Sequence, residues 1–453
     1  MIQKSRNQLK ESIKQKSSSS AKSIKKLLKQ RSFVVVIALI LTGLGASITS
    51  ISFKTGIYFI NNWRLNILEQ FSPHLILPIF GLVGGALSGW LIKNFAPAAK
   101  GSGVSQIMGF LRHKRVPMNI KVGLIKLISG IIAIGSGFPL GPEGPSVQMG
   151  GSVAWQMAKW LRAPIAFRRV IVAAGGGAGI AAVFSAPLGG FIYAIEELLN
   201  SARPVILLLV IVTTFIADSS ALIIQSLGIN PKAGGFDFQS GFSIEPTFKI
   251  DFSFLPIDFF YLVFLGIIIG LLAELYSKYV LMMQTLGKQL YKNKFVLKMS
   301  ICGLILGGIY SFLPNSFHNL DQLQKIIATQ NTDIGLAILA VFVLFITTGL
   351  AAASGAPGGL FYPMLTLGGA IGLIIGSLIP EHAPSTYIFA GMGAFVAGCS
   401  RTPITAMFLA FALTKDLIIL KPVLISCITS FLVARTFNQE SIYERQIGIE
   451  IDD

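Results

Sequence analysis

The feature that most constrains this chain is a stretch of 16 residues that occurs twice. The first copy, 136–151, reads SGFPLGPEGPSVQMGG, and the second, 354–369, reads SGAPGGLFYPMLTLGG. The copies share residues at one constant offset of 218 positions (354 − 136 = 218), at Ser136/Ser354, Gly137/Gly355, Pro139/Pro357, Gly141/Gly359, Pro145/Pro363, Gly150/Gly368 and Gly151/Gly369. The fold must therefore provide two places for the same Gly- and Pro-rich loop.

A second match follows each copy at an offset of 216 (403 − 187 = 216). Two ordered matches at nearly one offset predict a duplicated half-protein. The alternative is chance agreement between two Gly-rich membrane segments. The residues that recur are Ala174/Ala390, Gly175/Gly391, Gly177/Gly393, Ala178/Ala394, Ala181/Ala397 and Pro187/Pro403.

Each copy interrupts a strongly apolar region with residues that helices tolerate poorly. Irregular backbone at membrane depth is tolerated only where it is buried in protein or lines a cavity. Pro145 and Pro363 fit the first turn of a helix, where a missing N–H costs nothing. A helix start offers free N–H groups and a partial positive charge, which together make an anion site. Two such starts near the midplane are typical of transporters built from repeats.

The composition places the chain in a membrane. Hydrophobic residues make up 53% and charged residues 13% of the 453 residues, whereas about a quarter of a soluble domain is charged. The net charge of +17 is concentrated in the N-terminal segment and in short loops, so we reject nucleic-acid binding. We expect no metal site or cofactor, because the cysteines (Cys302, Cys399, Cys427) and the histidines (His74, His113, His318, His382) form no cluster.

Four regions are expected along the chain. Residues 1–31 are predicted to be a basic, disordered cytoplasmic tail, since ten basic residues there face one acidic residue, Glu11. The first half of the membrane part is 32–228, a polar linker is 229–251, and the second half is 252–453 with a short C-terminal segment. No cleavable secretory signal is expected. The resulting location is a bacterial-type plasma (inner) membrane, crossed several times, with the N-terminus in the cytoplasm.

Apolar runs predict an all-α polytopic protein whose helices vary in length. Glycines at 81, 84, 85 and 89 in the second run indicate close helix packing. Several runs are too short or too interrupted to span a membrane alone. The runs are Phe33–Phe53, His74–Phe95, Val122–Ile134, Val170–Leu199 (broken at Pro187), Pro204–Leu227, Phe252–Met283, Met299–Phe312, Ile334–Leu350, Ile388–Leu413 and Leu417–Phe437.

Glu143 stands in the first copy where the second copy has Phe361. When ionised, a carboxylate at an anion-binding helix start should fill the site, and when protonated it should release it. An intramembrane carboxylate is a functional candidate by default. The alternative is a glutamate that merely favours the helix dipole.

Three other positions carry candidate chemistry. Glu196 and Glu197 end a helical run, where they are either solvated or able to pass protons toward Glu143. Ser102 lies in a Gly-Ser-Gly break that either donates a hydroxyl to an anion or forms a plain turn. Tyr443 follows the last apolar run and is not distinguished by its own context.

The motifs together resemble the CLC family of chloride channels and chloride/proton exchangers. They are GSGVS at 101–105, GPEGPSVQ at 141–148, SAPLGGFIYAIEE at 185–197, SGAPGGLFYPM at 354–364 and IYERQ at 442–446. The resemblance covers nearly the whole chain after the basic tail. It implies two inverted-topology repeats of broken, tilted helices and a homodimer in which each subunit has its own anion pathway.

The resemblance also implies roles for individual residues. Ser102 and Tyr443 are expected to hold the central anion with their hydroxyls, beside Gly144 and the backbone N–H groups of Leu360 and Phe361. Glu143 is similar to the external gating glutamate of the family. Glu197 matches an internal proton-transfer glutamate that many exchangers have. The transported ligands are expected to be chloride and protons, and no enzyme activity or cofactor is expected.

Two residues depart from the family pattern. Pro142 stands where many relatives have Arg or Lys, which predicts weaker anion binding at the outer site. Ser105 replaces a frequent proline and is expected to be tolerated, because serine can also begin a helix. No regulatory domain of the cystathionine-synthase type is expected after Tyr443. We predict proton-coupled chloride antiport, with a passive voltage- or pH-gated chloride channel as the main alternative and a sodium-coupled organic-anion carrier or a scaffold as weaker ones.

Overall fold

The computed structural model describes residues 2–201, 203–227, 252–290, 294–330, 333–379 and 383–451, with side chains from residue 33 onward. Helices fill these ranges, and their β pairing is a single isolated bridge. The predicted linker 229–251 lies outside the described residues. The principal helices are α1 (Ile2–Leu68), α2 (Pro73–Phe95), α3 (Val104–Leu111), α4 (Ile120–Gly135), α5 (Glu143–Trp160), α6 (Ile165–Phe184), α7 (Pro187–Tyr193), α8 (Pro204–Ser226), α9 (Asp258–Leu290), α10 (Phe295–Ser311), α11 (Leu320–Ala328), α12 (Ile334–Ser354), α13 (Phe361–Gly376), α14 (Pro384–Ser400), α15 (Pro403–Thr414), α16 (Leu420–Phe437) and α17 (Ile442–Glu450).

The prediction of a polytopic helical membrane protein is confirmed. Within the described residues, seven helical stretches are long and apolar enough to cross a membrane, and α10, α13 and α15 are shorter apolar helices. The first crossing helix, α1, is longer at both ends than the predicted span Phe33–Phe53. Its backbone begins at Ile2, which differs from the disordered tail expected at 1–31. Residues without a branch at Cβ, such as Lys, Gln and Leu, favour a helix there.

Equivalent helix crossings show that the chain is built from two copies of one half. Gly150 of α5 lies against Gly175 of α6, so closely that a Cβ on either residue would meet the carbonyl group of the other. Gly368 of α13 and Gly391 of α14 meet in the same way. These four glycines are two of the pairs that the sequence repeat aligns. The duplication therefore fixes how two helix pairs pack.

The loops of the two halves also repeat backbone conformations. Gly137 and Gly355 both have positive φ, +107° and +76°, just before the Gly-rich loops. Ser185 ends α6 and Arg401 ends α14 in the left-handed conformation, with φ of 49° and 62°. A proline begins the next helix two residues later in each half. A left-handed residue at the end of a helix is a common stop signal.

That stop signal explains where two predicted runs break. The run Ile388–Leu413 is divided between α14 and α15, just before Pro403, which the repeat pairs with Pro187. The run Val170–Leu199 breaks at Ser185–Ala186, and its last turn, Ala194–Leu199, is π-helical. Hydropathy could not show the first break because both sides of it are apolar.

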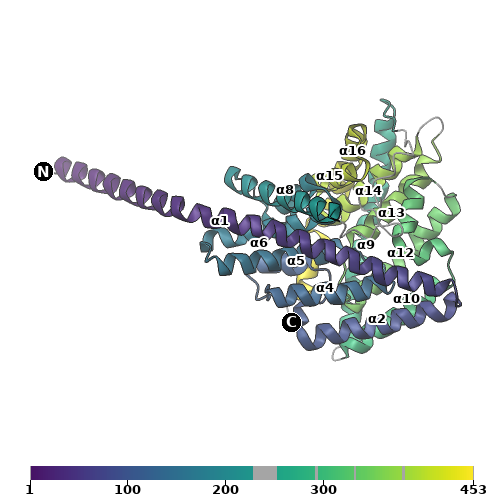
Figure 1. The fold of residues 1–453 in the computed structure, drawn as a ribbon. Helices are drawn as coiled ribbons and strands as arrows, with labels where there is room; N and C mark the ends of the chain where they lie inside the picture. Colours follow the sequence, from purple (N-terminus) through teal and green to yellow (C-terminus); the bar gives the residue numbers. More distant parts are fainter. Residues whose placement is uncertain are drawn as a thin grey trace.

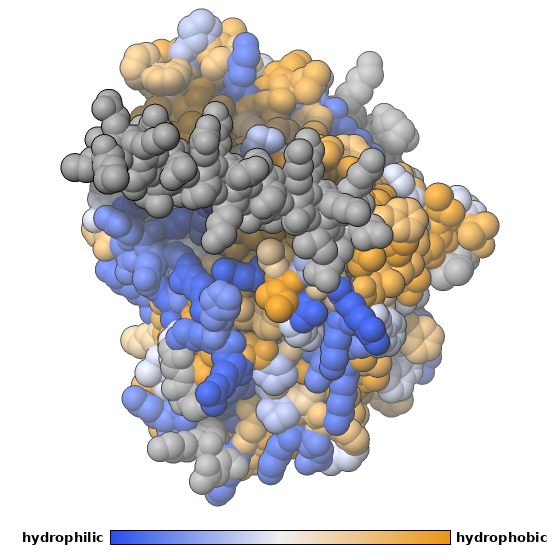
Figure 2. All heavy atoms as spheres, turned by 90° about the vertical axis from the view of Figure 1, so that its left-hand side faces the viewer, coloured by the Kyte–Doolittle hydropathy of each residue, from blue (hydrophilic) through white to orange (hydrophobic). Residues whose placement is uncertain are grey.

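Helices α2 and α10 confirm the predicted close packing (Figure 1). A Cβ at Gly81 would meet the backbone of Gly303, and a Cβ at Gly85 would lie 2.8 Å from the carbonyl carbon of Met299. Figure 2 views the end of the molecule that lies at the left of Figure 1 and shows hydrophilic side chains across its middle, with hydrophobic ones at the flank. This division suits an end that faces water beside a lipid-facing wall.

Candidate functional site

The two Gly-rich loops meet at the centre of the fold through their equivalent glycines. The N–H of Gly141 donates to the carbonyl of Gly359 at 2.9 Å, and the N–H of Gly359 donates to the carbonyl of Gly141 at 2.7 Å. The bridge is antiparallel. Equivalent residues that exchange hydrogen bonds in this way lie across a local twofold axis, as inverted repeats require. Helices α5 and α13 begin two residues after the bridge, so two helix starts converge.

The side chain of Glu143 reaches across to the start of the other helix. Glu143 is the first residue of α5 and is 1% exposed. Its Oε1 accepts a hydrogen bond from the N–H of Tyr362 at 3.0 Å, and the N–H of Phe361 faces the same carboxylate. Its Oε2 has no partner among the described residues. The carboxylate thus occupies the positive end of α13, where free N–H groups favour an anion.

Two glycines leave room for this carboxylate. A Cβ at Gly141 or at Gly359 would lie 2.6 Å from Cδ of Glu143. Real Cβ atoms do not approach a carbon so closely, so a larger residue would displace the acid. The glycines that the repeat shares at these positions are therefore needed for close approach.

Ser102, Gly144 and Leu360, three of the residues expected to surround the anion, lie close together. A Cβ at Gly144 would lie 2.9 Å from Cα of Gly359 and would also meet the carbonyl of Ser102. Ser102 and Leu360 line one small cavity, which we call the Ser102 cavity; its other lining residues include Leu140, Gly358 and Gln446. The Ser102 hydroxyl is buried and lies 3.5 Å from the hydroxyl of Ser105.

Tyr443 and Phe361 are also in contact. Phe361 lies between two tyrosines: its ring centroid is 5.6 Å from that of Tyr443 on α17 and 5.8 Å from that of Tyr193 on α7. Both tyrosine hydroxyls are buried without a hydrogen-bond partner among the described residues. Because a buried unpaired hydroxyl is costly, these two groups are suited to an anion or to water.

The sequence did not single out Tyr193. It precedes Glu197 by four residues, a spacing that places both side chains on one face of a helix. Its hydroxyl lies within electrostatic reach of the carboxylates of Glu143 and Glu197. The spacing of a tyrosine and an acid was the signal that could have found it.

The structure separates the two adjacent acids that the sequence could not distinguish. Glu196 accepts hydrogen bonds from the N–H groups of Ile404 and Thr405, at 3.3 and 2.8 Å, and from the Thr405 hydroxyl. It therefore caps the start of α15. Glu197 is buried and accepts a hydrogen bond from Ser441 at 3.0 Å. Ser441 is the N-cap of α17, the helix that carries Tyr443.

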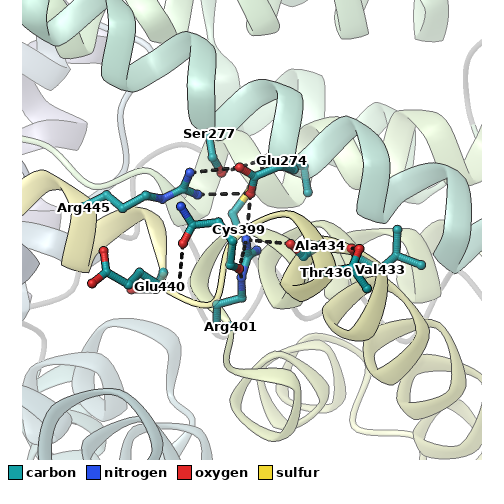
Figure 3. Close-up of polar contacts among 12 residues, drawn as sticks. Glu274, Ser277, Cys399, Arg401, Val433, Ala434, Thr436, Glu440 and Arg445 are labelled. Carbon is teal, nitrogen blue, oxygen red and sulfur yellow. Dashed lines mark hydrogen bonds and ion pairs between the residues drawn. The ribbon is translucent and has the colours of Figure 1, made fainter.

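A buried ion cluster holds α17 in place (Figure 3). Arg445 donates to both oxygens of Glu274 on α9, at 3.0 and 3.2 Å. Arg401 donates to the same carboxylate at 2.7 Å and to the carbonyls of Ala434 and Asn438. Arg445 follows Tyr443 by two residues, so this pairing fixes the position of the tyrosine.

The neighbourhood of Pro142 contains basic residues that the sequence did not connect with it. One cavity is lined by Pro142, Tyr362, Asp321, Lys54 and Arg64. The two basic residues belong to the part of α1 beyond the predicted span, which ended at Phe53. Basic side chains from α1 thus stand near the proline that replaces the family's Arg or Lys.

Ser105 lies in the first turn of α3, one residue after its start, and Gly103 is the N-cap. The serine therefore does not begin the helix, and its tolerance stays a prediction. Among the described residues, no group of three or more His, Cys, Asp and Glu side chains is placed to hold a metal ion. The absence of a metal or cofactor stays a prediction.

Comparisons with known proteins agree on one family. The family model described as "Voltage gated chloride channel" matches residues 84–435. The chain is 29% identical over 429 residues to the H(+)/Cl(-) exchange transporter ClcA of Salmonella paratyphi A, covering 91% of this chain and 86% of that protein. The ClcA of Salmonella agona gives the same identity and coverage.

Solved structures have the same fold. The crystal structure of a slow cyanobacterial Cl-/H+ antiporter matches with a TM-score of 0.80 and 26% identity, covering 93% of this chain and 98% of that one. A CLC-type fluoride/proton antiporter matches with a TM-score of 0.76 and 18% identity, covering 91% and 97%. At 18% identity, the similarity to the second structure shows a shared fold and nothing more.

Proposed function

Because this chain belongs to the voltage gated chloride channel family, we propose that it exchanges chloride for protons across a membrane. One observation carries the proposal: the Glu143 carboxylate lies on the N–H groups that begin α13. A halide and a carboxylate compete for such a site because each is an anion that the same dipoles stabilise. The curated relatives are named as exchange transporters, which supports exchange over passive conduction and a transporter over an enzyme.

The anion is held by five residues in this proposal. Ser102 and Tyr443 donate their hydroxyls, and Gly144, Leu360 and Phe361 present the backbone around them. The buried, unpartnered hydroxyl of Tyr443 and the cavity beside Ser102 support this assignment. Chloride is the transported ligand, and these groups replace part of its water shell without covalent chemistry.

Protons move through the two acids in this proposal. Glu143 takes up a proton when it leaves the start of α13, and chloride then takes the vacated place. Glu197 exchanges protons with the solution on the side where α17 begins. Tyr193 and Tyr443 lie within electrostatic reach of both acids, so water held by their hydroxyls can connect them.

Reconstituted vesicles test the proposal. With an outward chloride gradient, the wild type should take up protons, and a pH-sensitive dye with a chloride electrode reads both fluxes. Glu197→Gln should reduce proton flux more than chloride flux. Glu196→Gln is the matched control, because that acid caps α15. Chloride flux without proton uptake in the wild type would favour the passive channel instead.

The assembly and orientation are part of the same proposal. The protein forms a homodimer with one anion pathway in each subunit, and residues 32–228 and 252–453 are its two halves. The N-terminus faces the cytoplasm of a bacterial-type inner membrane. Arg169 in the first turns of α6 donates to the carbonyl of Leu111 and meets His113 of the basic segment 112–115, and such clusters favour the cytoplasmic side. Cross-linking in membranes and protease protection of an N-terminal tag test these two points.

A further inference from the structure

A second carboxylate, that of Glu450, lies beside the loop that carries Ser102. Glu450 is the last residue of α17. The Nε2 atoms of Gln106 and Gln284 donate to it at 2.8 and 3.2 Å, and the Ser105 hydroxyl also donates to it. A Cβ at Gly101 would lie 2.6 to 2.8 Å from its carboxylate atoms. The acid is therefore packed directly on the loop that carries Ser102.

Helix α17, which carries Glu450, does not itself stabilise the carboxylate at this place. The C-terminal end of a helix has a partial negative charge, which disfavours an anion. The stabilisation comes instead from other elements, through the three donors and nearby lysines. Lys126 on α4 and Lys100 act electrostatically on Glu450, and Lys126 also donates to the carbonyls of Ala99 and Gly101. Such a set of donors and positive charges would hold any small anion.

Two neighbouring cavities share residues that this carboxylate contacts. The first, which we call the lysine cavity, is lined by Glu450 together with Lys100, Lys288 and Lys298. These lysines are partly exposed, so the cavity reaches the surface. The second is the Ser102 cavity, and it shares Gly101, Gln284 and Ala352 with the first. Glu450 lines the lysine cavity and contacts Gly101 and Gln284, two of the shared residues, so it stands beside the boundary between the two cavities.

We propose that Glu450 is a tethered competitor for chloride at this second entrance: its carboxylate occupies an anion site and must be displaced or neutralised for chloride to reach Ser102. The inference extends the proposed function, since it gives the anion path a second acidic gate. The simpler account is a structural latch that only ties α17 to the Ser102 loop. The two accounts differ in what the removal of charge does to chloride binding.

The titration of Glu450 gives the proposal a pH dependence. Burial raises the pKa of its carboxyl, against the opposing effects of Ser105, Gln106, Lys126 and Lys100. Lys288 and Lys298 are the other charged groups lining the lysine cavity. As the pH falls through the raised pKa, the acid loses its charge, so competition weakens and chloride binds more tightly. Glutamine mimics the neutral acid.

Isothermal titration of chloride isolates this effect when the other acid is already neutral. In a Glu143→Gln background, adding Glu450→Gln should tighten chloride binding about tenfold at neutral pH, which corresponds to about 1.4 kcal/mol. The gain should shrink as the pH is lowered, because the parent then also becomes neutral at Glu450. Ser105→Ala should shift binding in the same direction by a smaller factor, since it removes one donor to the carboxylate. Glu440→Gln, an exposed acid before α17, is the matched control and should change nothing.

The proposal is wrong if the Glu450→Gln variant binds chloride as tightly as its parent, or less tightly, with an unchanged melting temperature in detergent. The structural latch would then be the remaining account. Glu450→Ala separates the two further. A competitor predicts tighter chloride binding even in a less stable protein, whereas a latch predicts weaker binding. The readout is independent of proton coupling, so a failure of exchange in vesicles does not decide it.

Discussion

The two copies of the Gly-rich loop have similar backbones, but the helix that follows each copy begins with a different kind of side chain. In the first copy α5 begins with Glu143, and in the second α13 begins with Phe361. The acid of the first copy rests on the helix start of the second, whereas the ring of the second packs between Tyr193 and Tyr443. The duplicated loops thus supply both a helix start with free N–H groups and the acid that rests on it. In the proposed mechanism, the acid that only the first copy carries is what couples protons to the anion.

The sharpest test of the comparison removes the acid. Glu143→Ala should lower proton flux in vesicles by about a hundredfold or more, as expected for loss of a positioned proton-transfer group. Chloride flux should persist, because the N–H groups of α13 remain. Proton uptake equal to that of the wild type would show that coupling does not depend on the difference between the copies.

The equivalent helix ends extend the comparison to stability. Ser185 and Arg401 end α6 and α14 in the same conformation, but only Arg401 pairs with the buried Glu274. Arg401→Ser should destabilise the protein by about 1.5–3 kcal/mol, because Glu274 loses a charged hydrogen bond while it keeps its pairing with Arg445. A large fall of the melting temperature in detergent is the expected result, and Lys415→Ser, at a more exposed helix end, is the control.

The glycine bridge tests whether the copies are truly equivalent. Gly141→Ala and Gly359→Ala should each cost about 1–3 kcal/mol by overpacking, and both should reduce proton coupling because each displaces the Glu143 carboxylate. Gly308→Ala, which has open space around it, should leave melting and coupling unchanged. Unequal effects of the two bridge variants on coupling would mean that only one copy positions the acid.

The smallest expected effect is at the tyrosines beside Phe361. Tyr443→Phe should weaken chloride binding about tenfold, since a hydrogen bond to a charged group contributes about 1.5–3 kcal/mol. Stability should hardly change, because the hydroxyl has no protein partner among the described residues. Tyr193→Phe is the matched variant and should spare chloride affinity while slowing proton flux. Titration calorimetry and vesicle fluxes separate the two outcomes.

Much of the fold and the centre of the site followed from local patterns. The repeat and the loops placed two helix starts together, and a charged residue in an apolar stretch pointed to Glu143. These features were predictable because glycine, proline and intramembrane acids each have few permitted environments.

What the sequence could not supply depends on contacts between distant residues. Glu196 and Glu197 are adjacent, yet one caps α15 and the other faces α17. Glu450 is an ordinary residue until the packing of α17 brings it to the loop that carries Ser102, and the spacing of Tyr193 from Glu197 does not show its contact with Phe361. The left-handed arginine that ends α14 is not marked by hydropathy, although the repeat pairs Pro403, where α15 begins, with the break at Pro187.

The bridge between Gly141 and Gly359 limits the kind of motion that can accompany transport. Two reciprocal backbone hydrogen bonds beside Glu143 join the two halves. Rocking one half against the other would break both hydrogen bonds. Because they are buried, water could not replace them, and the unpaired backbone groups would cost free energy. A movement of the Glu143 side chain past a fixed backbone costs less free energy. Turnover should therefore be limited by local rearrangements rather than by large changes of shape.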